Sequence, residues 1–515
     1  MQILARLGAT LQLSGLYHVF GAAAPLADLH ATIEKTRLQL GIPGLSVAVL
    51  YKGEIVFAEG FGKRNAQGDE YKASTLQPIG SVTKSFTAAA IGEMVAEGKL
   101  DWDTTPVNKY LPEFQYKDPV LTSQLTLVDL LSHRTDLGRK ADLAFYRSST
   151  PRIELLKRIR YIDMQSKLKS KMNYSNAQYA AAGEAAARVA GMSYEDVVRN
   201  KVINPLGLNN TGFSPVEMKN RTSNYAIPFS ALSLEDAQKG DVRPRDLEGV
   251  YLAGAPSGAI YSNVFDMVKY GRAIMKEGEL DGKQVLNKSS VQELLTAHSI
   301  VGGPAVAPES SSAMTYGLGW MLHTYKGHQV YWHNGATGGF TANLAMFPDD
   351  DLVVAHLCNL MYSDPGTNIF QHVADELLGL TKTHTWLPDV ALKAVEMSYQ
   401  AVASSRNGTG VVPERIPNQP PTHPLQDYVG VYSHLVYGDA SVTLEKNQDG
   451  KETLVLDVLS FRSTLEPYHF DVFTLQLEDV TSDMKTIATF KTVTVNRVES
   501  IVVDVTFPVE FKRKE

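Results

Sequence analysis

Hydrophobic and polar positions divide the chain into stretches with different patterns. An amphipathic repeat over residues 27–39 predicts a helix, and alternating runs at Leu45–Tyr51 and Glu54–Phe61, joined by Lys52-Gly53, predict an antiparallel hairpin. From about residue 81 to 210 the pattern is helical, with alanine-rich stretches that carry few charges. Strand patterns return at 329–332, 341–347 and 352–357. This order predicts an α+β fold: an antiparallel sheet flanked by helices, with an all-helical subdomain inserted.

The composition changes near the C-terminal end of this region. Residues 403–424 are rich in Ser, Gly, Asn and Pro, which is typical of a linker. Short alternating runs separated by turn signals follow and predict a small all-β barrel of about 90 residues. We therefore expect four segments: an N-terminal segment 1–25, an α+β domain 26–390, a linker 391–424 and a β-barrel domain 425–515.

The first 25 residues bear on the location of the protein. Arg6, a mostly apolar middle and an alanine-rich end resemble a secretory signal, although Gln12 and His18 interrupt the apolar part. No run reaches the roughly 18 apolar residues that cross a bilayer, so no membrane span is expected. Asn173-Tyr174-Ser175 is a glycosylation acceptor sequence, and a glycan there would block the candidate site described below. This favours a cytoplasmic location slightly over secretion.

Charge and composition narrow the classes of partner. The 515 residues carry a net charge of -7 without a long run of Lys or Arg, which argues against nucleic acid as a partner. The single cysteine, Cys358, forms no internal disulfide, and the 13 histidines show no metal-binding spacing. We therefore expect a small neutral or polar substrate and chemistry without metal or cofactor, while the oligomeric state stays open.

The sharpest local signal is Gly80-Ser81-Val82-Thr83-Lys84, at the expected start of a helix. Three residues apart, the Ser81 hydroxyl and the Lys84 amine lie on the same helix face. A serine hydroxyl needs a base to remove its proton, and a semi-buried lysine has a lowered pKa that suits this task. A serine helix cap followed by a solvated lysine would give the same pattern. The motif predicts a nucleophile only together with further residues.

One such group is Tyr174-Ser175-Asn176, which precedes a buried alanine-rich helix. A phenol and an amide therefore stand at the mouth of the helical subdomain. A tyrosine beside a lysine ammonium loses its proton more readily than its usual pKa of about 10 indicates. Tyr174 is thus a candidate base for Ser81 and a candidate acid for the leaving group. A tyrosine that only packs and caps is the alternative for this segment alone.

A second group is His333-Asn334-Gly335-Ala336, at the end of a predicted strand. A glycine at position 335 lets a substrate lie along the strand edge. The backbone N–H of Ala336 is a candidate partner for that of Ser81 in an oxyanion hole. A simple turn after an edge strand is the alternative.

The order Ser-x-x-Lys, Tyr-Ser-Asn, His-x-Gly resembles the serine beta-lactamase and penicillin-binding protein superfamily. It is most similar to the class C beta-lactamase-related branch, with its esterases, D-aminopeptidases and lovastatin-type acyltransferases. Three more segments resemble this branch: Leu130–His133, Pro256–Ser262 and Tyr316–Trp320. The resemblance covers residues 27–385 and implies a beta-lactamase/transpeptidase-like fold, while the tail from 425 resembles the lipocalin-like barrel appended to some members.

The resemblance also implies roles for single residues. Ser81 is the nucleophile, and Lys84 and Tyr174 form the proton-transfer pair. Asn176 binds the amide or carbonyl on the acyl side of the substrate, and His333 stands where many beta-lactamases have a lysine. Because a neutral histidine attracts a substrate carboxylate only weakly, we expect ester, D-peptide or acyl-transfer substrates rather than penicillins.

The loop after His133 departs from the family pattern. It reads Arg134-Thr135-Asp136-Leu137 instead of Thr-Ser-Gly-Leu, so we expect an altered loop there. Three functions fit the motifs. The first is a serine hydrolase that cleaves an ester or amide of a small metabolite or peptide. The second is an acyltransferase or transesterase of secondary metabolism, and the third is a catalytically silent binding protein of the same fold. The sequence also leaves open whether the barrel is a lid over the cleft or a stabilising appendage.

Overall fold

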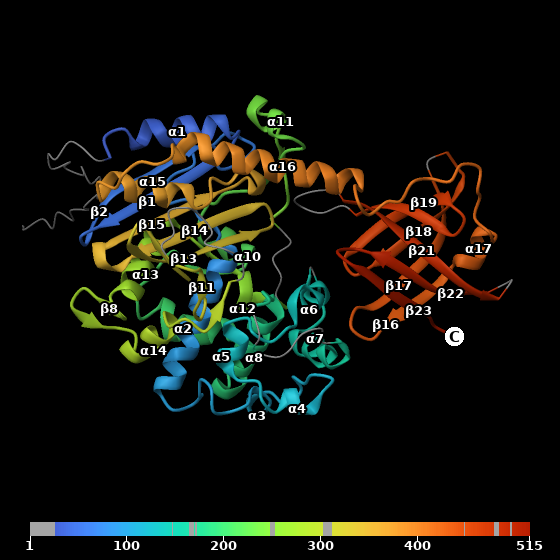
Figure 1. The fold of residues 1–515 in the computed structure, drawn as a ribbon, viewed down its shortest axis with the longest axis horizontal. Helices are drawn as coiled ribbons and strands as arrows, with labels where there is room; N and C mark the ends of the chain where they lie inside the picture. The colour runs from blue at the N-terminus through green and yellow to red at the C-terminus, as the bar shows by residue number, and fades with distance from the viewer. Residues whose placement is uncertain are drawn as a thin grey trace, which may run out of the picture.

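The computed structural model describes residues 26–146, 148–163, 169, 172–247, 253–301, 312–447, 449–477, 484–494 and 497–515. The signal-like segment 1–25 lies outside these residues. An α+β domain with a large antiparallel sheet is followed by a closed β-barrel (Figure 1). The predicted fold class is therefore confirmed, while the domain boundaries stay predictions.

Strands from both ends of the α+β domain meet in one eight-stranded sheet with the order β10-β11-β12-β13-β14-β15-β1-β2. Its members are β1 (Gly44–Tyr51), β2 (Glu54–Gly62), β10 (Ser299–Ile300), β11 (Thr315–Tyr316), β12 (Met321–Tyr325), β13 (His328–Thr337), β14 (Phe340–Phe347) and β15 (Leu352–Cys358). In the β1–β2 turn, Lys52 and Gly53 have φ of 50° and 85°, the geometry of a two-residue hairpin. The predicted hairpin and the return of strands to the sheet are both confirmed.

Helices cover both faces of this sheet. On one face lie α1 (Leu29–Gln39), α15 (Asn368–Leu377) and α16 (Ala391–Asn407), above the sheet in Figure 1. The other face packs against α13 (Val264–Met275). The first part of the predicted linker 391–424 is therefore a helix. Ala391, Val395 and Tyr399 recur every four residues in α16 and bury one stripe of it in the core between these helices and the sheet.

The remaining helices form the helical subdomain and its surroundings. They are α2 (Thr83–Ala96), α3 (Val107–Tyr110), α4 (Pro119–Thr122), α5 (Leu127–Leu131), α6 (Gly138–Phe145), α7 (Arg152–Arg158), α8 (Asn176–Ala190), α9 (Tyr194–Val198), α10 (Pro215–Arg221), α11 (Leu234–Lys239), α12 (Ala255–Gly258) and α14 (Lys288–Leu294). The alanine-rich helices α2 and α8 are largely buried, as their low charge predicts. The segment 215–245 contains the short helices α10 and α11. Ser214 and Ser233 cap them by accepting backbone N–H groups.

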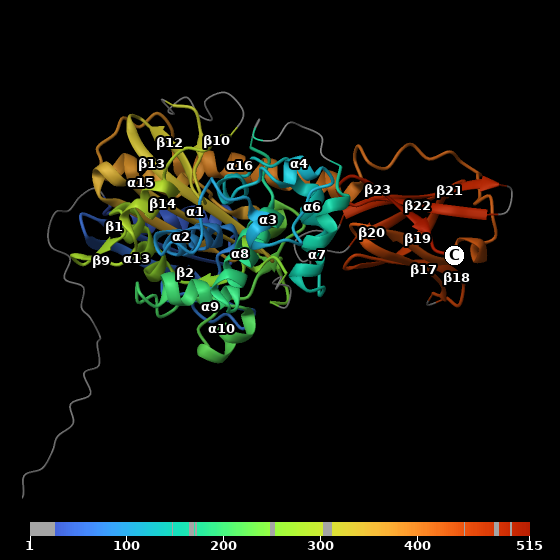
Figure 2. The ribbon, with the colours of Figure 1, turned by 90° about the horizontal axis from the view of Figure 1, so that it is seen from below.

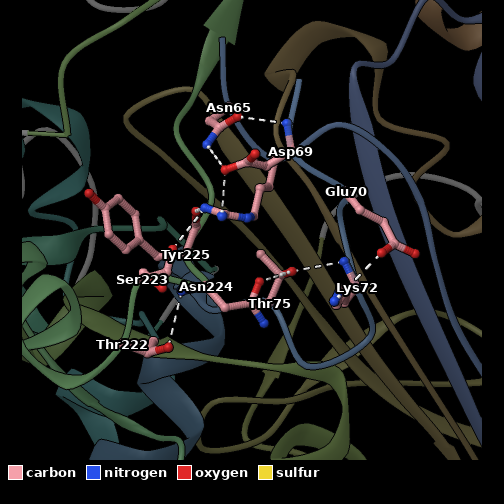
Figure 3. A network of polar contacts seen from close by, with 10 residues as sticks. Asn65, Asp69, Glu70, Lys72, Thr75, Thr222, Ser223, Asn224 and Tyr225 are labelled. Carbon is pink, nitrogen blue, oxygen red and sulfur yellow. Dashed lines mark hydrogen bonds and ion pairs between the residues drawn. The ribbon is translucent and has the colours of Figure 1, made fainter. Parts of the chain in front are cut away.

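Short strands fix the approach of the chain to the first residues of α2. They are β3 (Gln77–Pro78), β4 (Gly212–Phe213) and β7 (Ile260–Ser262), which form one sheet. Two further pairs of short strands are separate from it: β5 (Phe229–Ser230) with β6 (Arg243–Pro244), and β8 (Glu279–Leu280) with β9 (Lys283–Gln284). A polar network holds the loop before β3 (Figure 3). Thr75 Oγ1 accepts from the Lys72 N–H at 2.8 Å and donates to Asn224 Oδ1 at 2.8 Å. The chain thus enters α2 from an anchored position.

The C-terminal barrel is closed by the pairing of its first and last strands. It consists of β16 (Gly430–His434), β17 (Gly438–Lys446), β18 (Glu452–Val458), β19 (Phe461–His469), β20 (Val472–Leu477), β21 (Met484–Thr494), β22 (Arg497–Asp504) and β23 (Pro508–Arg513), preceded by α17 (Leu425–Tyr428). Buried rings pack together, with the centroid of Tyr428 at 5.4 Å from Phe473 and 4.7 Å from Phe490. The predicted all-β barrel is confirmed.

The barrel docks on the helical subdomain beside α6 (Figure 2). The hydroxyl of Tyr437 donates to the backbone carbonyl of Lys140 at 2.9 Å. The rings of Tyr146 and Phe461 stack with their centroids 5.8 Å apart. The helix α6 therefore has contacts with the barrel at both of its ends. In the part of the chain that is described, no helix has the length and apolar character to cross a membrane.

Candidate active site

Ser81 and Lys84 face each other at the start of α2. Ser81 lies in the single 3-10 turn Gly80–Val82 that leads into the helix. The Lys84 ammonium donates to Ser81 Oγ at 2.9 Å, to Asn176 Oδ1 at 2.7 Å and to the carbonyl of Ser257 at 2.9 Å. All three donors of a lysine are thus used. The predicted proximity of Ser81 and Lys84 is present, and Asn176 joins them.

Burial sets the charge state of Lys84. The side chain is fully buried, and burial lowers its pKa to about 7, against a smaller opposing effect of the Asp142 carboxylate. The rings of Tyr174 and Tyr179 lie 4.7 and 5.5 Å from the amine. A lysine with a pKa near 7 has a substantial neutral fraction at neutral pH, so it can accept a proton. The expected lowering of the lysine pKa is confirmed.

The carbonyl that Lys84 contacts belongs to α12, which is fixed to α2 by a second hydrogen bond. The Thr87 hydroxyl donates to the carbonyl of Pro256 at 2.7 Å, one turn further along α2. The hydroxyl of Ser257 turns away from the amine and donates to the Gly254 carbonyl at 2.7 Å. Ser257 therefore contributes its backbone oxygen to the site.

Asp142 of α6 anchors the Tyr174–Asn176 segment. Its carboxylate accepts from the Ser175 hydroxyl at 2.8 Å and from the Ala177 N–H at 2.9 Å, so it caps the N-terminus of α8. Burial raises the pKa of this carboxyl group, while these hydrogen bonds and the charge of Lys84 act in the opposite direction. Sequence reasoning missed Asp142, because one aspartate in a short helix carries no motif.

Tyr174 stands over the lysine, as predicted, but its acidity differs from the prediction. Burial raises the pKa of the Tyr174 phenol above its ordinary value, and a contact with the Ser81 hydroxyl offsets only part of this. The expected lowering of the Tyr174 pKa by the nearby ammonium is therefore wrong. Desolvation of the phenolate is the main cause, and the negative charge of Asp142 raises the pKa of Tyr174 further. Tyr174 is a phenol at neutral pH.

His333 is buried next to Tyr174 and makes its hydrogen bonds inside the protein. Its Nε2 lies 3.0 Å from the Tyr316 hydroxyl, and its Nδ1 lies 2.5 Å from the backbone carbonyl of Asn334. Burial and the charge of Lys84 lower the pKa of His333 to about 3, so the ring is neutral. In this neutral ring Nδ1 donates to the carbonyl and Nε2 accepts from the tyrosine. Both ring nitrogens of His333 therefore have partners inside the protein. A direct contact of this ring with a substrate stays a prediction.

A second buried histidine, His133, completes a cluster of rings around the lysine. The ring cluster comprises His133, Tyr174, Tyr179, Tyr316 and His333. The His133 centroid lies 4.2 Å from that of Tyr174, and its Nδ1 accepts from the Ser175 N–H at 3.2 Å. Burial lowers the pKa of His133 well below its usual range. The cluster therefore surrounds Lys84 with neutral groups, which favours the neutral amine.

The strand β13 passes tightly over Ser81. The strand predicted to end before His333 continues to Thr337, so Gly335 and Ala336 lie in β13. A Cβ atom at Gly335 would lie 1.9 Å from the carbonyl oxygen of Ile79 and 2.9 Å from the backbone nitrogen of Ser81. One at Gly80, whose φ is 52°, would lie 2.6 Å from the nitrogen of Ala336. Two glycines therefore let the Ser81 and Ala336 backbones approach closely.

A cavity of about 520 Å³ opens above these groups. Ser81, Tyr174, Asn176 and Ala336 line its floor, together with Asp142 and Ser257. Lys84 itself is fully buried and does not line the cavity. Among the residues that the structure describes, no group of three or more His, Cys, Asp or Glu side chains is placed to hold a metal ion.

The loop after His133 accommodates its unusual sequence. Asp136, which stands where the family pattern has glycine, has a φ of 65°. This left-handed region favours glycine and tolerates aspartate better than most residues. The amide of Asn173 donates to Asp136 Oδ1 at 3.3 Å, which ties this loop to the segment that carries Tyr174.

Comparisons with known proteins agree with the fold. The Beta-lactamase family matches residues 29–406, and a domain of unknown function, DUF3471, matches residues 414–515. An unguisins hydrolase of Aspergillus campestris is 26% identical over 442 residues, which are 82% of this chain and 78% of that protein. Penicillin-binding protein 4 of Amycolatopsis lactamdurans is 25% identical over 376 residues, 72% of this chain and 95% of that protein.

A solved structure extends the likeness over both parts of the chain. The octameric penicillin-binding protein homologue from Pyrococcus abyssi aligns with a TM-score of 0.60 at 21% identity, covering 95% of this chain and 100% of that one. The class that fold and family define is that of the beta-lactamase-related hydrolases. The chain belongs to the Beta-lactamase family, which confirms the resemblance found in its sequence.

Proposed function

We propose that this protein is a serine hydrolase that forms an acyl-enzyme on Ser81 and cleaves an ester or amide of a small metabolite or peptide. The observation that carries the proposal is the set of partners around the Lys84 amine: Ser81 Oγ, Asn176 Oδ1 and the Ser257 carbonyl. These three partners determine whether the Ser81 hydroxyl can pass its proton to Lys84.

The partners of Lys84 determine where a neutral amine directs its lone pair. A neutral amine keeps two N–H donors and has one lone pair that must accept. The amide oxygen of Asn176 and the Ser257 carbonyl only accept, whereas the Ser81 hydroxyl can also donate. When Lys84 loses its proton, the lone pair therefore turns to Ser81, and the O–H points at the base. This is the arrangement for general-base activation of a serine.

In the proposed acylation, Ser81 Oγ bonds to the carbonyl carbon of the substrate and its proton moves to Lys84. The developing oxyanion lies between the backbone N–H groups of Ser81 and Ala336. The Tyr174 phenol gives its proton to the leaving alcohol or amine and regains one from the Lys84 ammonium. The raised pKa of Tyr174 supports this role as a relay, because a phenol that is not ionised can donate.

In the proposed deacylation, water replaces the leaving group. As water adds to the acyl carbon, its proton passes to the Tyr174 phenol, which gives its own proton to neutral Lys84; the Ser81 oxygen then leaves and takes a proton back from the Lys84 ammonium. Asn176 presents its Nδ2 donor to the cavity because its Oδ1 is held by Lys84, which supports binding of a substrate carbonyl on the acyl side.

The substrate class follows from charge and from one relative. His333 is neutral and its ring nitrogens are occupied, so it supplies no positive charge for a carboxylate of the kind that penicillins carry. The relative named as an unguisins hydrolase, with 26% identity over most of both chains, supports a hydrolytic reaction. We therefore place esters and amides ahead of penicillins as substrates.

A substrate panel tests the proposed function. The purified protein is assayed with p-nitrophenyl esters, D-amino acid anilides and nitrocefin, beside Ser81→Ala and the control Ser85→Ala. Ser85 lies one turn further on in α2, where it donates to the Val82 carbonyl at 2.8 Å. We expect ester or anilide turnover that Ser81→Ala abolishes and Ser85→Ala retains, with little nitrocefin cleavage. Full turnover in a folded Ser81→Ala protein would contradict the proposal.

A further inference from the structure

The outer wall of the catalytic cavity comes from the barrel. Besides Ser81 and its neighbours, the cavity is lined by barrel side chains, namely Phe461, Leu477, Met484 and Val505. They belong to β19, β20, β21 and the loop after β22. We call these four side chains the barrel wall. A cavity above the proposed nucleophile is therefore completed by residues that lie more than 370 positions further along the sequence.

The wall is held in place by contacts with α6. The Phe461 ring stacks on Tyr146, with centroids 5.8 Å apart and ring planes 17° apart. The Tyr437 hydroxyl donates to the Lys140 carbonyl, near the other end of α6. The same helix carries Asp142, which caps α8 next to Tyr174. Barrel wall and proposed catalytic groups are thus attached to one helix.

The end of α6 also contributes apolar side chains to the cavity. They are Leu143 and Phe145 of α6 and Tyr146 directly after it. The two surfaces together present aliphatic and aromatic groups to the space beside Ser81. Cavities that are mainly apolar with a few placed polar groups are typical of small-molecule sites. The polar lining residues are those proposed for the chemistry together with Arg139, Thr337, Ser405 and Thr506.

We propose that the barrel wall binds a bulky apolar or aromatic group in the acyl part of the substrate. The inference rests on the proposed function of Ser81. The acyl part stays bonded to the serine through both half-reactions, whereas the leaving group departs after the first, so a wall that encloses the serine acts longest on the acyl part. In this arrangement the barrel sets substrate preference while the chemistry belongs to the α+β domain.

An acyl series with one leaving group tests this. The full-length protein is assayed with p-nitrophenyl acetate, butyrate, hexanoate and phenylacetate. An apolar pocket distinguishes a missing methylene by about 10-fold or more. We expect kcat/KM for the hexanoate or phenylacetate to exceed that for the acetate by at least about tenfold. We expect Phe461→Ala to remove most of this preference by lowering kcat/KM for the hexanoate and phenylacetate more than for the acetate.

Phe470→Ala is the matched control. Phe470 is also a barrel phenylalanine, 41% exposed, and it lies outside the cavity. It should keep the wild-type preference. Because Phe461→Ala also removes the stack on Tyr146, Met484→Ala provides a second variant that leaves this stack intact, and thermal unfolding of each variant reports whether it is folded.

The possible outcomes separate the two proposals. Unchanged acyl preference in folded Phe461→Ala and Met484→Ala overturns the role of the barrel wall while Ser81-dependent turnover continues. A second series uses aryl acetates, which differ only in the leaving group. If Phe461→Ala and Met484→Ala change the preference within this series and not within the acyl series, the assignment of the barrel wall to the acyl part is overturned. Turnover that does not depend on Ser81 contradicts the proposed function itself.

Discussion

The Nζ atom of Lys84 lies 2.9 Å from the Oγ atom of Ser81, and its other two partners are oxygens of an amide and a carbonyl. Because neither of those oxygens can donate, the lone pair of a neutral Lys84 has the Ser81 hydroxyl as its donor. The charge state of one buried amine thus determines the direction of the hydrogen bond to the proposed nucleophile.

The pH dependence of kcat/KM follows from this charge state. Burial lowers the pKa of Lys84 to about 7, and only the neutral amine accepts the serine proton. We expect kcat/KM to fall about tenfold per pH unit below that pKa and to reach a plateau above it. The raised pKa of Tyr174 keeps this phenol protonated across the plateau. A profile measured from pH 5 to 9.5 checks this, and a descending limb near pH 8 would contradict it.

Tyr174→Phe isolates the role of the phenol. The variant keeps the ring, whose centroid lies 4.7 Å from the Lys84 amine, and removes only the hydroxyl. Loss of a proton relay typically costs about 10²–10⁴-fold in rate. We expect kcat to fall within this range with little change in the unfolding temperature. Tyr110→Phe, in α3 and outside the cavity, is the control, and wild-type kcat in Tyr174→Phe would refute the relay.

Asp142→Asn tests a positioning residue that touches no reacting atom. The carboxylate raises the pKa of Lys84, so its neutralisation lets that pKa fall further. We expect the acid limb of the kcat/KM profile to move to lower pH. The asparagine oxygen can still accept from the Ala177 N–H, which limits the loss of stability to about 1 kcal/mol. Asp449→Asn, in an exposed barrel turn, should leave the profile unchanged, and an unmoved acid limb in Asp142→Asn would exclude the coupling.

Gly335→Ala tests the close passage of β13 over Ser81. The added Cβ would lie 1.9 Å from the Ile79 carbonyl oxygen, so the backbones must separate. We expect destabilisation of about 1–3 kcal/mol and a large loss of kcat, since the two backbone N–H groups no longer converge. At Gly258 a Cβ would meet nothing closer than 3.8 Å, so Gly258→Ala should retain the wild-type unfolding temperature. Equal unfolding temperatures of Gly335→Ala and Gly258→Ala would show that β13 accommodates a Cβ atom at position 335 and would contradict the close passage.

Local patterns in the sequence predicted much of the fold. The hairpin at Lys52-Gly53 and the alanine-rich helices α2 and α8 were identified because their signals are short-range: turn residues, alternation and a low number of charges. The helix α16 was missed because its stripe of Ala391, Val395 and Tyr399 is narrow and merges into a polar stretch.

In the candidate site, contacts between residues close in the sequence were predicted, whereas contacts that depend on tertiary packing were not. Ser81 and Lys84 are three residues apart, so their contact follows from the helix period. Asp142 meets the start of α8 only through tertiary packing, and nothing in its neighbourhood signals this. The acidity of Tyr174 was predicted in the wrong direction because the degree of desolvation depends on the complete ring cluster. Phe461 and Met484 reach the cavity from another domain, which no local pattern encodes.

Covalent labelling of Ser81 tests the central claim most directly. The full-length protein is incubated with a fluorophosphonate probe, and the modified peptide is identified by mass spectrometry, beside Ser81→Ala and Ser85→Ala proteins. The account predicts one adduct on Ser81, absent in Ser81→Ala, retained in Ser85→Ala and formed faster as the pH rises through about 7, where Lys84 becomes neutral. Absence of any adduct on Ser81 in the folded protein, or labelling at another residue instead, would contradict it.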